Sequence, residues 1–290
     1  MIPAAMSHKA LLDDISAANR PDDHFRFWWL GQSGFLIQYQ SKHLLLDPYL
    51  SDSLTKKYSE SHQPHLRMTE LAVLPEQLDF IDIVTSSHRH TDHLDGETLC
   101  PLLQNNPDLE LLVPTAQIEF SAQRLGCDPS RFRHLDAGSS LSLGPFEFHA
   151  ITAAHDTVER DSSGNCVYLG YVIRFGQWTL YHSGDTIPHE GLMEQLGPFD
   201  IDLAFLPING RAPERRVSGN FWGEEAAALA HEAGIKWVIP CHYHMFSFNS
   251  VTPDDFVRAC HRLNQPYGVP RVGERWESVG CLLYTSDAAD

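Results

Sequence analysis

The sequence predicts an α/β protein in which two β-containing layers pack face to face, with helices on their outer sides. Apolar strand-like runs alternate with helical segments, and the order of the first half returns in the second half. Potential metal ligands follow four separate strand-like runs, and two facing layers are the simplest way to bring those strand ends to one edge. With 290 residues, 42% of them hydrophobic, the chain can bury such a core.

The first part of the chain is predicted to be a helical arm followed by a β-meander. Residues 1–24 form the arm, which is weakly amphipathic. Gly31 and Gly34 supply a turn between closely spaced apolar runs, a pattern typical of antiparallel strands. Residues 49–78 carry few strand or helix signals, and a connection of this length usually forms a wall or lid over a site. The meander strands are expected at 25–30 (FRFWWL), 35–39 (FLIQY) and 43–47 (HLLLD).

The remaining elements alternate between short strands and helices. Thr115 is expected to cap one helix and Gly126 to stop it, and Pro253 suits the first turn of the last helix. Strands are expected at 80–85, 109–113, 132–135, 140–143, 146–152, 167–175, 178–181, 201–206 and 237–240, and helices at 96–103, 115–125, 190–196, 221–233 and from 252 onward.

These elements are predicted to form one domain over residues 25–276, followed by a tail over 277–290. The final residues, LLYTSDAAD, fit none of the preceding pattern. They resemble translated adapter sequence from environmental gene fragments, so the tail is expected to be non-native, with an ordinary disordered tail as the alternative.

Four potential metal ligands lie within six residues, directly after the strand expected at 80–85. They occur in the stretch SSHRHTDHLD and are His88, His90, Asp92 and His93. Imidazole and carboxylate groups bind Zn, Mn and Fe, and residues at i, i+2 and i+4 of an extended backbone point to one side. A solvated His-rich turn is the alternative, but this order after a buried strand favours a metal-binding loop.

Three more ligand-type residues follow later strands, namely His155, Asp185 and His242, and Gly184 permits a tight turn that directs Asp185 inward. Two divalent cations sharing a bridging ligand would activate a hydroxide for hydrolysis. The simplest assignment gives one cation His88, His90 and His155, gives the other Asp92, His93 and His242, and lets Asp185 bridge them. Asp47 lies at the end of the strand 43–47. It is expected either to orient a metal ligand by a hydrogen bond, without binding the cation itself, or to initiate a turn before Pro48.

The HRHTDH cluster, the later His155, the SGDT motif and the PCHYH motif resemble the metallo-β-lactamase superfamily. Over residues 25–276 the chain is more narrowly similar to the UlaG-like branch, which is related to L-ascorbate-6-phosphate lactonase. The resemblance implies an αββα sandwich and metal-dependent hydrolysis that opens the lactone of a phosphorylated sugar acid. The Gln-Ser pair between Gly31 and Gly34 and the segment 211–220 depart from the branch's pattern. The matching motifs are WWLGQSGFLI, LLLDPYLSD, IDIVTSSHRHTDHLD, YHSGDT, LPINGR, VIPCHYHMFSFN and TPDDF.

Asp92 and Asp185 are the predicted catalytic carboxylates. Asp92 would steady the attacking water or return a proton to the leaving alkoxide, and plain ligation is its alternative role. Arg211 is the first choice for binding a small anionic substrate, because the arginine fork suits phosphate and carboxylate. A run with three arginines is also typical of a solvated loop on an acidic protein. The full set of predicted substrate contacts is Asn209, Arg211, Tyr243 and His244.

The composition indicates which binding partners and which cellular compartment to expect. The chain has 38 acidic and 21 basic residues, and its formal charge of -17 disfavours nucleic-acid phosphate as a partner. Residues 1–20 lack the pattern of a secretory signal, and no apolar run approaches the roughly 18 residues of a membrane span. Six cysteines without CxxC spacing fit a reducing compartment, so a cytoplasmic protein is expected. A homo-oligomer remains open, with the aromatics of 25–29 and the segment 49–78 as its candidate interface.

Two other functions also remain open at this point. A phosphodiesterase or phospholipase-like hydrolase on the same dinuclear site would turn over phosphate diesters. A non-catalytic metal-binding protein would use the same ligands without turnover. The ligand types do not distinguish Zn, Mn and Fe.

Overall fold

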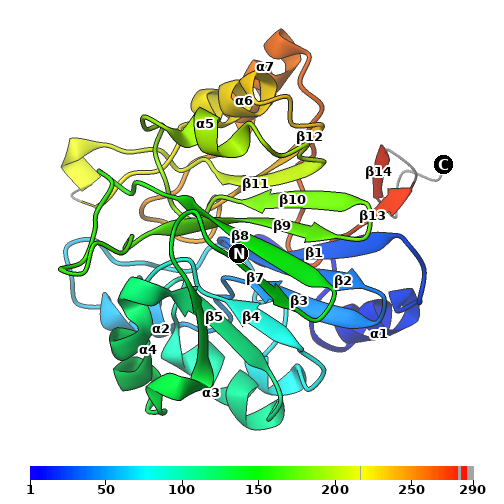
Figure 1. The fold of residues 1–290 in the computed structure, drawn as a ribbon, viewed down its shortest axis with the longest axis vertical. Helices are drawn as coiled ribbons and strands as arrows, with labels where there is room; N and C mark the ends of the chain where they lie inside the picture. Colours follow the sequence, from blue (N-terminus) through cyan, green and yellow to red (C-terminus); the bar gives the residue numbers. More distant parts are fainter. Residues whose placement is uncertain (216, 280–281, 286–290) are drawn as a thin grey trace.

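The computed structural model describes residues 1–215, 217–279 and 282–285, and its two β-sheets pack face to face (Figure 1). Eight strands form the first sheet within these residues. In spatial order they are β14 (Leu282–Thr285), β13 (Arg275–Val279), β1 (Phe25–Gly31), β2 (Gly34–Tyr39), β3 (Lys42–Leu46), β4 (Ile83–Thr85), β5 (Glu110–Pro114) and β6 (Phe132–Leu135). The predicted meander β1 to β3 is antiparallel, whereas β3 to β6 are parallel, so β3 to β6 end at the same edge.

The second sheet has six strands among the described residues. In spatial order they are β12 (Trp237–Cys241), β11 (Leu203–Pro207), β10 (Trp178–His182), β9 (Leu169–Phe175), β8 (Phe146–Thr152) and β7 (Ser140–Leu143). β10, β11 and β12 are parallel to one another. β9 is antiparallel to both β8 and β10, so β8 runs in the same direction as β10. The carboxyl ends of β8, β10, β11 and β12 therefore share one edge.

Helices cover the outer side of each sheet, which confirms the predicted αββα layering (Figure 1). The first sheet is covered by α1 (His8–Ala18), α3 (Gly96–Asn105) and α4 (Ile118–Leu125), and the second by α5 (Leu192–Leu196), α6 (Gly223–Glu232) and α7 (Asp254–Leu263). The short α2 (Ser53–Lys57) lies in the connection between β3 and β4. Gly126 ends α4 as predicted, with a left-handed φ of 66°. None of the described helices is both long and apolar enough to cross a membrane.

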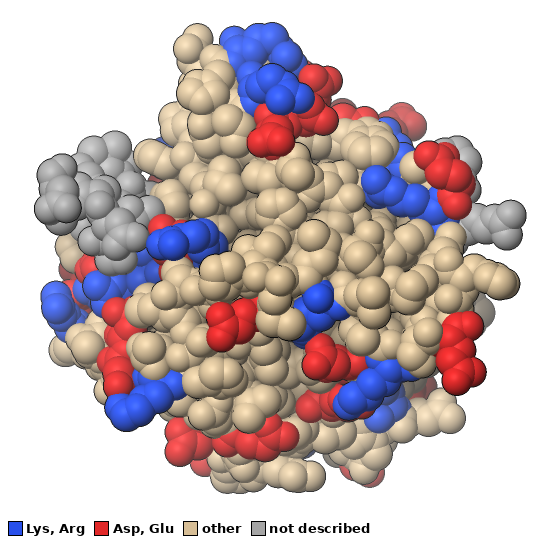
Figure 2. All heavy atoms as spheres, turned by 180° about the vertical axis from the view of Figure 1, so that it is seen from behind, with Lys and Arg blue, Asp and Glu red and all other residues tan. Residues whose placement is uncertain are grey.

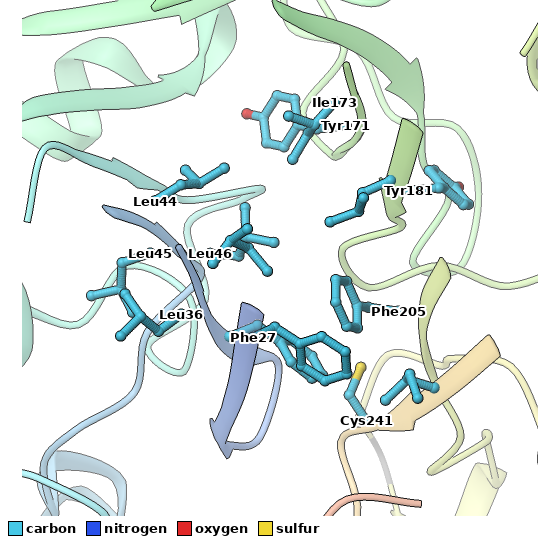
Figure 3. Packing of buried hydrophobic residues seen from close by; sticks show 14 of the residues in the cluster. Phe27, Leu36, Leu44, Leu45, Leu46, Tyr171, Ile173, Tyr181, Phe205 and Cys241 are labelled. Atoms are coloured by element: carbon cyan, nitrogen blue, oxygen red, sulfur yellow. The ribbon is translucent and has the colours of Figure 1, made fainter. Parts of the chain in front are cut away.

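The core lies between the two sheets and is rich in aromatic side chains (Figure 3). Phe205 of β11 stacks on Phe35 of β2 with ring centroids 4.0 Å apart, and it meets Phe27 of β1 edge to face at 5.2 Å. All three rings are fully buried. Because burying one such side chain contributes about 2–3 kcal/mol, contacts of this kind hold the two sheets in a fixed relation. That relation positions the loops at the sheet edges.

The N-terminal arm and the C-terminal strands belong to the same packed unit. Leu11 and Ile15 of α1 are buried in the core, and Asp14 accepts a hydrogen bond from Trp28. β13 pairs with β1 and β14 pairs with β13, so the domain does not end at residue 276 as predicted. Residues 286–290 of the predicted tail lie outside the described residues.

The burial of residues 25–29 shows that one expectation about assembly is wrong. The side chains of 25–29 are all buried, because β1 lies inside the first sheet, so they are not available as an interface between copies.

On the face drawn in Figure 2, basic and acidic side chains lie near one another in small groups, without a continuous basic field.

Candidate metal centre

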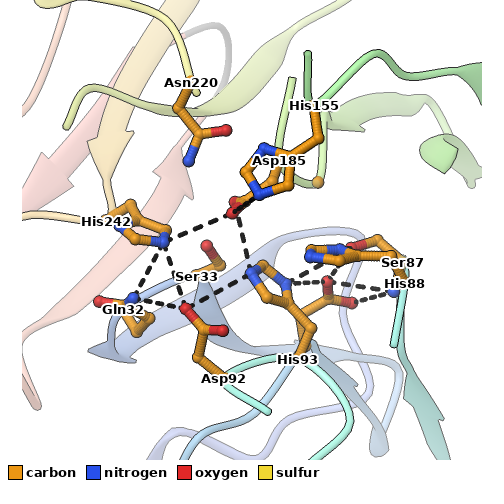
Figure 4. Close-up of polar contacts among 12 residues, drawn as sticks. Gln32, Ser33, Ser87, His88, Asp92, His93, His155, Asp185, Asn220 and His242 are labelled. Carbon is orange, nitrogen blue, oxygen red and sulfur yellow. Dashed lines mark hydrogen bonds and ion pairs between the residues drawn. The ribbon is translucent and has the colours of Figure 1, made fainter. Parts of the chain in front are cut away.

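The predicted ligands converge at the edge where the strands of both sheets end (Figure 4). The loop 86–95 follows β4 in the first sheet. From the second sheet, His155 follows β8, Asp185 follows β10 and His242 follows β12. Since these strands direct their carboxyl ends to one edge, residues more than 150 positions apart in the sequence become neighbours.

Three groups of potential ligand atoms lie together among the described residues, and two of them match the predicted division; the third consists of Asp47, His88 and His93. The donor atoms of His88, His90 and His155 lie within 4.8 Å of one another, and so do those of Asp92, His93 and His242.

Asp185 lies between the two groups. Its Oδ1 is 3.3 Å from His93 Nε2, and its Oδ2 is 3.5 Å from both His155 Nε2 and His242 Nε2. A carboxylate that reaches both groups has the position expected of a bridging ligand.

Several of these donor atoms make no hydrogen bond with good geometry to another described residue, although His93 Nε2 and Asp185 Oδ1 lie 3.3 Å apart. His88 Nε2, His93 Nε2 and Asp185 Oδ1 are buried and make no hydrogen bond within the described part of the chain. A buried polar atom left unsatisfied costs about 1–3 kcal/mol, and a divalent cation would satisfy all three. The residues therefore fit a metal centre.

Hydrogen bonds behind the cluster orient the imidazoles. Asp47 is fully buried and accepts a hydrogen bond from His93 Nδ1 at 2.7 Å, as well as from Thr85 Oγ1 and Ser87 N. His155 Nδ1 donates to Gly219 O at 2.7 Å. With Nδ1 engaged in this way, Nε2 of each ring is the nitrogen that faces the cluster and can bind a cation. These contacts support the prediction that Asp47 orients a metal ligand.

The backbone of the His-rich loop differs from the extended conformation that we expected. His93 N and Leu94 N both donate to His90 O, so the segment forms a turn. An extended chain would place His88, His90 and Asp92 on one side, whereas the turn sends Asp92 and His93 towards the second group. His242 itself has a left-handed φ of 60°, a conformation that costs roughly 1–2 kcal/mol in a non-glycine residue and is typical of functional sites.

The two groups differ in their protonation. Burial lowers the pKa of His88 well below its usual value and that of His90 to about 4, and positive neighbours add to the effect. Burial alone would also lower the pKa of His93 and His242. However, the carboxylates of Asp185 and Asp92 raise the pKa of His93 well above its usual value and that of His242 to about 9. His88 and His90 are therefore neutral and able to bind a cation, whereas His93 and His242 must first release a proton.

Metal occupancy is expected to depend on pH more strongly in the second group than in the first. Because the pKa of His242 in the metal-free protein is about 9, a cation must displace its proton at neutral pH, and its affinity falls as the pH falls. Titration of metal into weakly buffered apoprotein should release protons. Equilibrium dialysis from pH 8 to pH 5 should show one equivalent lost before the other. Simultaneous loss of both equivalents without proton release would contradict this order.

The four predicted substrate contacts do not line the cavity beside the cluster. The Arg211 guanidinium makes two hydrogen bonds of 2.7 Å to Glu225, and Asn209 is buried against Asn220 and Asn249. The Tyr243 hydroxyl donates to Pro270 O, and its ring is stacked on Trp29. The His244 ring contacts the Tyr243 ring edge to face, with centroids 5.1 Å apart, and His244 does not line the cavity either. The assignment of these residues to substrate binding is therefore not supported, because tertiary partners occupy most of their polar groups.

A cavity of about 380 Å3 opens beside the ligand cluster, a size suited to a small molecule. The segment 49–78 contributes to its wall as predicted, through Leu54, Lys57, Tyr58 and His65. The sequence analysis gave no site role to His65 or Gln32, which both line the cavity. The Gln32 amide nitrogen lies 2.7 Å from Asp92 Oδ2 and 2.9 Å from His242 Nε2. The only sequence signal for Gln32 was a polar pair in a turn between two apolar strands.

Comparison with known proteins supplies the family context. The family described as "Beta-lactamase superfamily domain" matches residues 42–243. A UPF0173 metal-dependent hydrolase from Rubrobacter xylanophilus is 28% identical over 245 residues, which cover 82% of this chain and 89% of the relative.

Two solved structures share the fold. An isothiocyanate hydrolase from Delia radicum gut bacteria has a TM-score of 0.69 at 18% identity, covering 90% of this chain and 100% of the other. A possible metal-dependent hydrolase from Veillonella parvula also has a TM-score of 0.69, at 17% identity, covering 86% and 98% of the two chains.

Proposed function

Because the chain belongs to the beta-lactamase superfamily and is a metal-dependent hydrolase, we propose that it opens the lactone ring of a small anionic substrate, a phosphorylated sugar acid. The observation that carries the proposal is the position of Asp185 between the two ligand groups, within 3.5 Å of His93, His155 and His242. The similarity of the sequence motifs to the UlaG-like branch supports the choice of a lactone.

We assign two divalent cations, Zn or Mn, to the centre, with Fe as a further candidate. His88, His90 and His155 would hold one and Asp92, His93 and His242 the other, with Asp185 reaching both. When bound, the cations supply a water that is nucleophilic at neutral pH and polarise a carbonyl oxygen.

Asp92 is the side chain that we propose to transfer a proton during hydrolysis. It lines the cavity, and its side chain is 16% exposed, more than the side chains of His93, His155, Asp185 and His242. Its nearest neighbours are His242 Nε2 at 3.3 Å and the Gln32 amide. The carboxylate can therefore accept a proton from the attacking water and return it to the alkoxide released by ring opening. Gln32 holds the carboxylate in place by donating a hydrogen bond to it.

Metal analysis coupled to a hydrolysis screen tests the proposal. Purified protein is expected to contain up to two equivalents of Zn or Mn and to hydrolyse phosphorylated sugar lactones faster than phosphate diesters or β-lactams. Chelation should abolish turnover, and the added metal should restore it. Faster turnover of a diester than of every lactone tested would overturn the lactonase assignment.

A phosphodiesterase or phospholipase-like activity is the second candidate. Leu54, Phe120, Val217 and Phe246 also line the cavity, and apolar side chains of this kind favour a substrate with an apolar portion. In that case the phosphorus atom, rather than a carbonyl carbon, would lie at the centre.

A further inference from the structure

Three basic side chains line the cavity beyond the metal ligands, namely Lys57, Arg89 and Arg124. No acidic side chain lies within ion-pair distance of any of them in the described part of the chain. Many other basic residues are neutralised, for example Lys56 by Glu97 at 2.7 Å and Arg211 by Glu225 at 2.7 Å. In a protein with a formal charge of -17, unpaired cations gathered in the cavity that holds the centre call for an explanation.

Arg89 is fixed next to the centre by its place in the chain and by its packing. It lies between the ligand residues His88 and His90, and its guanidinium is 5.7 Å from the ring centroid of Phe120. The Arg124 guanidinium lies over the same ring at 4.5 Å. Stacking on an aromatic face holds a guanidinium in a defined plane and leaves its N–H edge free for an anion.

Arg124 also stabilises the loop that carries Arg89. Its Nη1 donates to the carbonyl oxygens of Arg89 at 2.6 Å and Leu94 at 3.1 Å. These bonds connect α4 to the ends of the turn that contains the ligands. Lys57, at the end of α2, lines the same cavity, and its ammonium lies 5.1 Å from the centroid of the Tyr58 ring.

We propose that Arg89 and Lys57 form a subsite for an anionic group of the substrate, a phosphate or a carboxylate, that is separate from the bond being hydrolysed. This inference rests on the proposed function and deepens it. The bidentate edge of Arg89 recognises two oxygens of the anion, and Lys57 adds a point charge.

The subsite distinguishes between the two candidate substrates. A phosphorylated lactone needs one place for the carbonyl at the centre and a second place for its phosphate. A phosphate diester carries its only anion at the reacting phosphorus and leaves Arg89 and Lys57 without a partner. Unpaired cations next to the centre therefore favour the lactone with a distant anionic group.

Kinetics of Arg89→Ala and Lys57→Ala test the subsite, with Lys56→Ala as the matched control. Lys56 is adjacent to Lys57 and carries the same charge, but it is paired with Glu97 and does not line the cavity. For a phosphorylated lactone, KM is expected to rise about tenfold or more in Arg89→Ala while kcat changes little. Hydrolysis of the same lactone without its phosphate should be unchanged, and Arg89→Lys should recover part of the loss. Metal content, measured in each variant, should equal that of the wild type.

A binding measurement separates the subsite from the proposed activity. Calorimetry with glucose 6-phosphate and the metal-loaded protein should give weaker binding in Arg89→Ala and Lys57→Ala, but not in Lys56→Ala. If this pattern appears and no lactone is hydrolysed, the subsite stands and the lactonase assignment fails. If lactones are hydrolysed but neither KM nor binding responds to Arg89 or Lys57, the subsite is overturned and the lactonase assignment stands.

Discussion

Replacing His88 and His90 together by alanine is expected to remove bound metal and to lower kcat/KM by at least about 1,000-fold, or ~4 kcal/mol. The reason is that His88 and His90 provide two of the three donors in the first group, which leaves only His155 and Asp185 near that position. Elemental analysis and steady-state kinetics measure the two effects.

A matched control uses histidines outside the cluster. His62→Ala combined with His134→Ala removes the same number of imidazoles from exposed positions and should leave metal content and rate unchanged. Full retention of metal in the His88 and His90 variant would remove the basis for the proposed centre. Circular dichroism of both proteins shows whether the fold is kept.

Gly184→Ala is expected to destabilise the protein by about 3–5 kcal/mol and to reduce metal binding at the same time. Gly184 has a left-handed φ of 60°, and a Cβ there would lie 2.6 Å from Leu169 O and 2.8 Å from Ser87 Cβ. The backbone would have to shift to relieve these contacts, and Asp185 is the next residue. Thermal unfolding and metal titration measure the two consequences.

Gly144→Ala is the matched control for this substitution. Gly144 has a similar φ of 53°, but a Cβ there would meet nothing within 4 Å. Its variant should show only the cost of the left-handed conformation, about 1–2 kcal/mol, with metal binding intact. Equal effects of the two substitutions would mean that the contacts of Gly184 with Leu169 and Ser87 are unimportant.

The features that were predictable from the sequence depend on local patterns. Apolar runs give the strands, Gly126 gives a helix end, and the dense ligand cluster after β4 marks the metal-binding loop. His155, Asp185 and His242 were also found, because each directly follows an apolar strand and strand ends meet at one edge. The conformation of the loop was not, since the hydrogen bonds to His90 O depend on where the backbone has to deliver Asp92 and His93.

The substrate contacts were less predictable, because the state of a charged side chain depends on its tertiary neighbours. The sequence analysis chose Arg211 for anion binding and did not single out Arg89. In the structure Glu225 neutralises Arg211, whereas Arg89 has Phe120 beneath it and no carboxylate partner among the described residues. Glu225 is 14 positions from Arg211 in the chain, and nothing in the local pattern marks the two as partners.

The first sheet supplies four of the seven proposed ligands through the loop after β4, and the second sheet supplies three, His155, Asp185 and His242. Neither half of the polypeptide holds a complete coordination sphere. A cation can therefore bind fully only when the two sheets are packed together. By mass action, a bound cation stabilises that packed state against unfolding.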